Sequence, residues 1–294
     1  MSSYSSDEKC RALLEKLRWP KGIECPRCKG TKITRLDGKV LLCLPCEYHF
    51  TGTVGTLFAD THLPLEKWFL AALLLCEAKK GMSACQIQRT IGVSYKTAWY
   101  LCHRIREAMI QAQSPTLWGT VEVDETYVGG VEKGGKRGRG SNKQIVIGLR
   151  QRGGELRLFH VQDVKSGTLE RYIKDNISGA VDVIITDDSS TYPKAIEADP
   201  LFGDFRGKHQ TINHSSGLYV RGTIHTNTIE NSFSLLKRGM FGTWHHVSAK
   251  HLWRYLTEMM FRFNRRNHSD LWLDTIRSLV SAPSLKFAEL VSSK

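Results

Sequence analysis

Two pairs of cysteines restrict the fold of the N-terminal part of the chain more than any other feature does. Cys25, Cys28, Cys43 and Cys46 form the pattern C-x2-C-x14-C-x2-C. Each pair is placed on a tight turn, and the segment between the pairs alternates like a β-hairpin around Asp37-Gly38. Four thiolates complete a tetrahedral shell around Zn²⁺ and leave no position for water. We therefore predict a zinc ribbon with one structural Zn²⁺, which stabilises the fold and takes no part in chemistry.

The remaining cysteines, Cys10, Cys76, Cys85 and Cys102, lie singly on expected helices, where we predict small core residues. The N-terminus has no basic start followed by an apolar core, so a signal peptide is not expected. The most apolar stretch, residues 69–76, is too short to span a bilayer. We therefore expect a cytoplasmic protein without a membrane partner, in which cysteines are thiols or metal ligands.

The charge of the chain indicates a polyanionic partner. Its 294 residues include 42 Lys and Arg against 29 Asp and Glu, a formal net charge of +13. Basic side chains set against phosphates release condensed counterions, which favours binding to nucleic acid. The hydrophobic content of 41% is ordinary for a globular protein with buried cores. A protein that is merely basic is the alternative interpretation.

The first half of the chain is expected to hold two domains. A helix over residues 7–18 and the ribbon make up residues 1–58. Residues 59–114 carry a helix over 65–79, one capped by Ser83 and ended by Gly92, and one capped by Ser94. This order is typical of a helix-turn-helix, although any two helices joined by a glycine turn look similar. In that interpretation Ser94, Tyr95 and Lys96 begin a recognition helix, and Arg104 and Arg106 contact phosphates.

From residue 115 to 270 the pattern changes to strands alternating with helices. Strands are expected over 121–128, 144–150, 155–161 and 181–186, with a possible strand at 210–213. Helices are expected over 166–177, near Tyr192, and over 228–240 and 248–267. This order predicts a mixed sheet with crossover helices, followed by a C-terminal tail over residues 271–294.

A glycine-rich basic segment, residues 133–143, separates the first two strands of this domain. Its candidate DNA contacts are Lys136, Arg137, Arg139 and Lys143. Such a segment beside an acidic site could guide a phosphate backbone towards it. A solvated loop without a ligand is the alternative.

Three acids stand at the edge or end of regular elements. Asp124 lies in the strand VEVDETYVGG, Asp187 follows the apolar run VDVIIT, and Glu230 opens a helix. Oxygen ligands suit Mg²⁺ or Mn²⁺, and two such ions promote in-line attack on a phosphodiester. Neighbouring acids compete for these roles: Asp188 beside Asp187, and Glu122 and Glu125 beside Asp124. Strand alternation puts Glu122 on the same face as Asp124 and Glu125 on the opposite face.

The order of these acids resembles that of RNase H-like DDE recombinases. The blocks VEVDETYVGG, TDDSSTY, HTNTIENSFSLLKRG and HLWRYLTEMMFRFNRR, with WPKGIECPRCKG and CLPCEYHFTGTVGTLF, resemble bacterial insertion-sequence transposases with an N-terminal zinc ribbon. This group is insertion-sequence family 1595, with the ISXO2-like transposase domain, and the resemblance covers residues 19–267. It implies an RNase H-like catalytic domain that binds terminal inverted repeats, cleaves DNA strands and transfers them to a target.

The resemblance also implies roles for individual residues. Asp124 and Asp187 would share two Mg²⁺ or Mn²⁺ ions, and Glu230 would complete the second site. Asn231 or Asn227 could take the place of Glu230, because the third ligand varies in this group. Lys237, on the same face of its helix as Glu230, would lie near the scissile phosphate, and Arg238 beside it would contact DNA.

The implied partners are the DNA of the element's ends and of the target. At least a homodimer on DNA is expected, since two ends must be brought together, and the protein would associate with the bacterial nucleoid. A non-catalytic DNA-binding regulator derived from such an enzyme is one alternative function. A nuclease of the same fold that never joins its products is the other.

Overall fold

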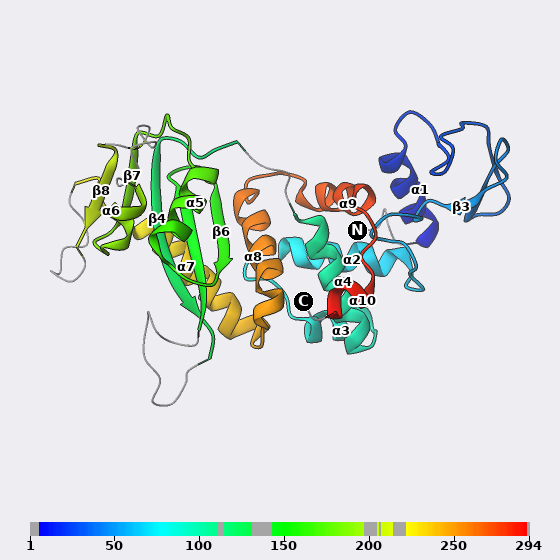
Figure 1. Cartoon of the computed structure of the whole chain (residues 1–294). Coiled ribbons are helices and arrows are strands. Elements are labelled where there is room, and N and C mark those ends of the chain that lie inside the picture. The colour runs from blue at the N-terminus through cyan, green and yellow to red at the C-terminus, as the bar shows by residue number, and fades with distance from the viewer. Residues whose placement is uncertain are drawn as a thin grey trace. The chain divides into compact units, whose positions relative to one another are not determined.

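The computed structural model describes residues 6–110, 115–130, 143–196, 205, 207–213 and 222–292. The chain divides into two compact units, one formed by Met1–Ile110 together with Asn267–Lys294 and the other by Gln111–Arg266 (Figure 1). Among the described helices, none has both the length and the apolar character needed to cross a membrane.

The first unit begins with α1 (Asp7–Arg18) and a small antiparallel sheet. Its strands are β1 (Ile33–Arg35), β2 (Val40–Cys43) and β3 (His49–Thr51), in the order β1-β2-β3. Three short strands bury little apolar surface. Their core consists of Leu41, Phe50 and two of the cysteines, with Trp19 and Tyr48 packed at its edge. A core of this size generally needs a metal or disulfides to be stable.

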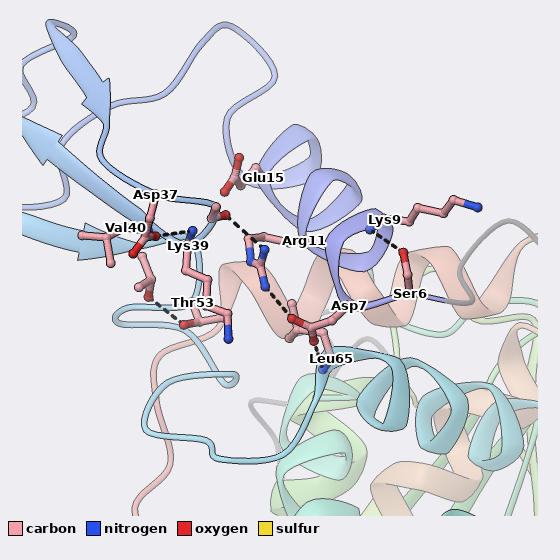
Figure 2. A network of polar contacts seen from close by, with 12 residues as sticks. Ser6, Asp7, Lys9, Arg11, Glu15, Asp37, Lys39, Val40, Thr53 and Leu65 are labelled. Carbon is pink, nitrogen blue, oxygen red and sulfur yellow. Dashed lines mark hydrogen bonds and ion pairs between the residues drawn. The ribbon is translucent and has the colours of Figure 1, made fainter.

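Polar contacts of α1 tie this small sheet to the helices that follow (Figure 2). Arg11 donates to the Gly38 carbonyl at the β1–β2 turn (3.0 Å) and pairs with Asp7 on its own helix. Asp7 accepts the backbone N–H of Leu65, the first residue of α2 (Leu65–Glu77), at 2.7 Å. The N-cap residue of α2, Pro64, offers no side-chain cap, so a carboxylate from another helix satisfies this N–H.

Local capping signals set the next two helices. Ser83 accepts the N–H of Gln86 and starts α3 (Ala84–Ile91), which ends at Gly92 in the left-handed conformation. Ser94 accepts the N–H of Thr97 and starts α4 (Tyr95–Ala108). Serine oxygens satisfy free N–H groups of the first turn, and glycine adopts a positive φ without strain. These helix starts agree with the sequence prediction.

The C-terminal residues form helices that pack within the first unit, although we expected a tail there. α9 (Leu271–Ser281) and α10 (Phe287–Val291) follow the second unit in sequence. On α9, Ile276 and Leu279 are fully buried, and Trp272 donates its indole N–H to the Phe69 carbonyl of α2 (3.1 Å). The apolar face of α9 therefore completes the core that α1, α2 and α4 begin.

The second unit is built on a five-stranded mixed sheet with the order β6-β5-β4-β7-β8. Its strands are β4 (Thr120–Val128), β5 (Gln144–Gln151), β6 (Leu156–Val161), β7 (Val183–Asp187) and β8 (His209–Ile212). β4, β5 and β6 pair antiparallel, while β7 runs parallel to both β4 and β8. The mixed sheet predicted from the sequence is confirmed.

Two apolar cores cover the two faces of this sheet. One joins Val121 and Val123 of β4 to residues of α5 (Ser166–Asn176) and α6 (Thr191–Ile196). The other joins Val128 to residues of α7 (Asn227–Gly239), α8 (Ala249–Asn264) and the π-helix Met240–Trp244. Alternate residues of β4 therefore face different helices, and those with even numbers face α7.

Candidate active site

Asp124 and Asp187 stand on neighbouring parallel strands at the centre of the sheet. Glu122 of β4 is paired in register with Ile185 of β7. Asp124 and Asp187 each lie two residues further along, and paired residues of parallel strands project to the same face. The pairing of the two strands ends at Glu122 and Ile185, so Asp124 and Asp187 lie just beyond the paired segment, at corresponding positions of the two strands. The face they share is the one that α7 covers.

α7 approaches this face closely because a glycine stands beside Asp124. Gly148 of β5 is the register partner of Asp124. A Cβ atom at Gly148 would lie 2.7 Å from the Ile229 side chain and 2.8 Å from the Phe233 ring, both on α7. Glycine therefore lets the first turns of α7 lie directly on the strand. Glu230, in the first turn of α7, is exposed and accepts a hydrogen bond from the Thr226 hydroxyl (2.8 Å).

The electrostatics of Asp124 reflect its burial and the acids around it. Burial raises the pKa of Asp124 well above its ordinary value, and the carboxylates of Glu125, Asp187 and Glu230 raise it further. A hydrogen bond from the Glu125 N–H to Asp124 Oδ1 (2.8 Å) acts in the opposite direction. Acids that disfavour each other's charge are stabilised by a cation placed between them. The donor set, oxygen atoms alone, is the kind that Mg²⁺ and Mn²⁺ prefer.

These acids do not converge on a single point. Within the described ranges, the group of His, Cys, Asp or Glu donors lying within 4.8 Å of one another is the four cysteines, and the three acids are not part of such a group. A two-ion site does not require all ligand atoms to lie within that spacing, because the two ions are themselves roughly 4 Å apart. Divalent-cation binding by these acids is therefore a proposal that their oxygen donors support.

The competing acids of β4 have other partners. Glu122 is fully buried and accepts hydrogen bonds from Arg152 Nε (2.7 Å) and from the Ile229 N–H (2.8 Å). Glu125 lies on the opposite face, where it accepts a hydrogen bond from the buried Tyr192 hydroxyl (2.5 Å). Asp188, one residue beyond the end of β7, is exposed. Asp124 is thus the acid of β4 that faces Asp187 and Glu230 together.

The other sequence-predicted residues of α7 lie along its exposed side. Lys237 is exposed seven residues after Glu230, a spacing that puts both on one face of the helix. Arg238 is exposed, and its guanidinium donates to the Ser234 carbonyl and hydroxyl, both at 3.2 Å. Asn227 and Asn231 are exposed as well, so the alternatives to Glu230 remain compatible with this geometry.

The four cysteines of the ribbon fit a tetrahedral zinc site. Cys25 Sγ lies 3.7 Å from Cys46 Sγ, and Cys28 Sγ lies 3.5 Å from Cys43 Sγ. Zn–S bonds of about 2.3 Å in a tetrahedron require S···S distances of about 3.8 Å, close to those found. The N–H of Gly30 points to Cys28 Sγ at 3.4 Å, as is usual around a thiolate. The residues present therefore fit the structural Zn²⁺ predicted from their spacing.

The candidate DNA contacts of the first unit separate into exposed and buried residues. Ser94, Tyr95 and Lys96 are exposed at the start of α4. Arg104 and Arg106, expected to contact phosphates, are only 4% and 2% exposed. Arg104 donates to the Ala59 carbonyl (2.6 Å) and stacks over the Trp68 ring, and burial lowers its pKa. This corrects the prediction that Arg104 and Arg106 contact phosphates, because both side chains are buried within their unit.

The predictions for the basic segment, residues 133–143, and for the four single cysteines have mixed outcomes. Of the basic segment, Lys136, Arg137 and Arg139 lie outside the described residues, and Lys143 is half-buried immediately before β5. Among the single cysteines, Cys10, Cys76 and Cys102 are buried as expected, but Cys85 is exposed. Cys85 lies in the first turn of the amphipathic α3, whose buried residues are Ile87 and Ile91.

Several residues that shape the site were not recognised in the sequence. Gly148 carried only a general signal, a glycine inside an apolar strand, which often marks a close approach of another element. The Arg152-Gly153 turn sets its register on β6, where it pairs with Leu158, and not its pairing with Asp124 on β4. Thr226 stands four residues before Glu230, a spacing that brings two side chains together at a helix start. Arg152 and His225, which lie beside Glu122, had no such signal because they come from distant loops.

Comparison with known proteins agrees with this architecture. The family description "ISXO2-like transposase domain" matches residues 116–264, about half of the chain, and "Transposase zinc-ribbon domain" matches residues 5–49. A protein of Halobacterium salinarum, named as an uncharacterized protein in transposable element ISH50, is 30% identical over 280 residues, covering 89% of this chain and 92% of that protein. This chain therefore belongs to the family of insertion-sequence transposases that combine a zinc ribbon with an ISXO2-like transposase domain.

Proposed function

We propose that this protein cleaves DNA at the ends of an insertion sequence and joins the freed 3′-hydroxyl to target DNA, using an RNase H-like DDE site. The observation that carries the proposal is the placement of Asp124 and Asp187 on adjacent parallel strands under the first turn of α7, with Glu230 close enough to raise the pKa of Asp124. Membership of a transposase family supports the same reaction.

Each acid has a distinct task in this proposal. Asp124 and Asp187 would hold two Mg²⁺ or Mn²⁺ ions between them, and Glu230 would complete the shell of the second ion. Two bound ions supply activation of the attacking oxygen and stabilisation of the leaving oxygen. Glu230 keeps its orientation through the Thr226 hydroxyl, which donates to one of its oxygens. Asp124 must be deprotonated to act as a ligand, so its raised pKa makes metal binding depend on pH.

Basic residues beside the acids would orient the DNA strand. Lys237 is exposed on the Glu230 face of α7 and could contact the scissile phosphate, and Arg238 could contact its neighbour. In the other unit, the exposed start of α4, with Tyr95 and Lys96, suits reading of base edges in a major groove. The net charge of +13 supports binding of a long phosphate backbone, as does Lys143, which stands immediately before β5.

The decisive experiment is strand cleavage and joining with purified protein, Mg²⁺ and a plasmid that carries the DNA flanking the coding region. We expect nicks with free 3′-hydroxyls at the element ends and joined products. Asp124→Ala, Asp187→Ala and Glu230→Ala should each lower the rate by roughly 10³-fold, since losing a metal ligand removes several kcal/mol of charge stabilisation.

Asp188→Ala is the matched control, because Asp188 is exposed beside Asp187, and its rate should stay within about twofold of wild type. Equal activity of Asp124→Ala and wild type would refute the site. Activity of Glu230→Ala together with inactivity of Asn231→Ala or Asn227→Ala would move the third ligand to an amide. Cleavage without any joined product would indicate a nuclease, and binding of the ends without cleavage would indicate a regulator.

A further inference from the structure

Glu122 is a charged side chain in an interior position, two residues from Asp124 on the same face of β4. It is 0% exposed. One oxygen accepts from Arg152 Nε (2.7 Å) and lies 3.4 Å from His225 Nδ1, and the other accepts the N–H of Ile229 (2.8 Å). Its register partner on β5 is the buried Arg150. A buried carboxylate is stable only when paired and hydrogen-bonded, and both oxygens of Glu122 meet that requirement.

The bond to Ile229 makes Glu122 the cap of α7. Ile229 is in the first turn of this helix, where N–H groups have no partner within the helix. The residue in the N-cap position, Thr226, makes no side-chain cap bond, and its hydroxyl donates instead to Glu230. A carboxylate at this end also interacts favourably with the helix dipole. The cap of α7 thus comes from the strand that carries Asp124.

Arg152 strengthens this connection from the β5–β6 turn. Besides Glu122, its guanidinium donates to the Thr223 carbonyl (2.6 Å) and to the His225 carbonyl (2.9 Å). The backbone N–H of Arg152 donates to the Thr120 carbonyl at the start of β4 (2.9 Å). One side chain therefore joins β4, the hairpin turn and the segment that leads into α7. Because the guanidinium group is rigid and planar, its hydrogen bonds restrict both translation and rotation of that segment.

We propose that Glu122, held by Arg152, is a positioning residue that sets the distance between Asp124 and Glu230 and so determines how tightly the site binds its divalent cations. The inference rests on the proposed function for its catalytic consequence, but the anchor itself is a property of the fold. Glu122 takes no part in the reaction. It acts through the first turn of α7, where Ile229 and Glu230 are adjacent.

The test compares Glu122→Gln, Glu122→Ala and Arg152→Gln in the full-length, zinc-loaded protein. Glutamine keeps an oxygen that can accept the Ile229 N–H but loses the charge facing Arg152, whereas alanine loses both. Glu155→Gln is the matched control, because Glu155 pairs with Arg157 (3.3 Å) in the same hairpin. Four quantities are measured: amide exchange at Ile229, Mn²⁺ affinity by calorimetry, affinity for end DNA, and the Mg²⁺ dependence of cleavage.

We expect Glu122→Ala to exchange the Ile229 amide at least about tenfold faster than wild type and to bind Mn²⁺ about 10- to 100-fold more weakly, as for other residues that orient ligands. Glu122→Gln should show a smaller loss, and Arg152→Gln should lie between the two. End-DNA affinity should stay within about twofold, and Glu155→Gln should match wild type. If Glu122→Ala does not fold, Glu122→Gln alone decides, since it retains the acceptor.

Unchanged Ile229 exchange and unchanged Mn²⁺ affinity in both Glu122 variants would overturn the proposal. A loss of Mn²⁺ affinity that merely equals the fraction of unfolded protein in each variant would overturn it as well. The two proposals fail separately. If wild type never cleaves DNA but the variants bind Mn²⁺ more weakly, the positioning role stands and the transposase reaction does not. If wild type cleaves and the Glu122 variants require no additional Mg²⁺, the reaction stands and the positioning role is lost.

Discussion

At the scale of single residues, the acidic site depends on one position without a side chain. Gly148 stands beside Asp124 in register, and α7 occupies the space that a Cβ would fill. The atoms that a larger residue would meet belong to Ile229 and Phe233, in the first two turns of the helix that carries Glu230. The distance between strand and helix is therefore set by packing as well as by hydrogen bonds.

Gly148→Ala should push α7 away from the sheet. Because overpacking a buried contact costs about 1–3 kcal/mol, we expect a loss of that size in the free energy of unfolding, together with weaker Mn²⁺ binding. Urea unfolding followed by circular dichroism measures the first. Gly167→Ala is the control, since a Cβ at this exposed helix position meets nothing within 4 Å. Equal stability of the two variants would contradict the tight packing at Gly148.

Asp124 should make the protein without added Mg²⁺ less stable as the pH rises. Its pKa in the folded state is raised above the unfolded value, mainly by burial and then by neighbouring acids, so its contribution is fully present below the unfolded pKa. That contribution is lost as the pH rises through the raised folded pKa. Asp124→Asn cannot ionise, so it should become the more stable protein above the ordinary aspartate range.

Thermal unfolding of both proteins from pH 4 to 8, zinc-loaded and without Mg²⁺, measures this difference. Adding Mg²⁺ at the upper end should stabilise wild type more than Asp124→Asn, because a bound cation favours the charged carboxylate. A stability difference that does not change with pH would show that Asp124 keeps an ordinary pKa in the fold.

At the scale of elements, two helices start with caps that come from elsewhere in the chain. Asp7 of α1 accepts an N–H of α2, and Glu122 of β4 accepts an N–H of α7. The sequence predicted the helices whose own N-cap residues, Ser83 and Ser94, satisfy their first turns. A serine immediately before apolar residues at helical spacing is a local signal. Long-range caps leave no such signal, which is why Glu122 was predicted only as a competitor of Asp124.

The ribbon is the element that should respond most strongly to metal removal. Structural zinc contributes about 10–16 kcal/mol in small domains, far more than β1–β3 gain from their few buried residues. A chelator should therefore unfold residues 20–60 and expose Trp19, whose ring packs edge-on against Phe50 (6.1 Å). The red shift of tryptophan emission and the loss of zinc, measured together, check this.

Cys43→Ser should reproduce the chelator effect without chelator. Cys85→Ser is the control, because Cys85 is exposed on α3 and distant in sequence from the ribbon. A ribbon that keeps its amide-exchange protection after zinc is lost would contradict the assignment of a structural ion.

At the scale of the whole molecule, most elements follow from the sequence but their grouping into units does not. Strand alternation and helical periodicity predicted β4 to β7 and the helices α1 to α5, α7 and α8 to within a few residues of their observed bounds, and predicted α6 by its position near Tyr192 alone. The same reasoning separated residues 271–294 from the N-terminal helices, because periodicity carries no information about which distant faces meet. The burial of Arg104 was missed for the same reason: its partners, Ala59 and Trp68, lie far earlier in the chain.

A chain that stops at Arg266 should lose the fold of the first unit. Truncation removes α9, whose Thr275 hydroxyl contacts Cys76 Sγ (3.1 Å) and whose Leu279 carbonyl accepts the Leu57 N–H (3.1 Å). We expect exposed apolar faces on α2 and α4, lower solubility and loss of end-DNA binding. Fluorescence of a hydrophobic dye and limited proteolysis, mapped by mass spectrometry, would locate the unfolding. A chain that stops at Ala282 keeps α9 and should retain the protected helices.

The first unit is built from residues on both sides of the sheet-bearing unit, so its core cannot be completed before the second unit has been synthesised. Residues 267–292 leave the ribosome only after the whole of the sheet-bearing unit has been made. Leu279, which the early helices bury, is therefore among the last parts of their core to arrive. A nascent polypeptide that has not yet reached α9 would present the acids of the second unit without a finished first unit, so that the first unit is complete only after α9 has been synthesised.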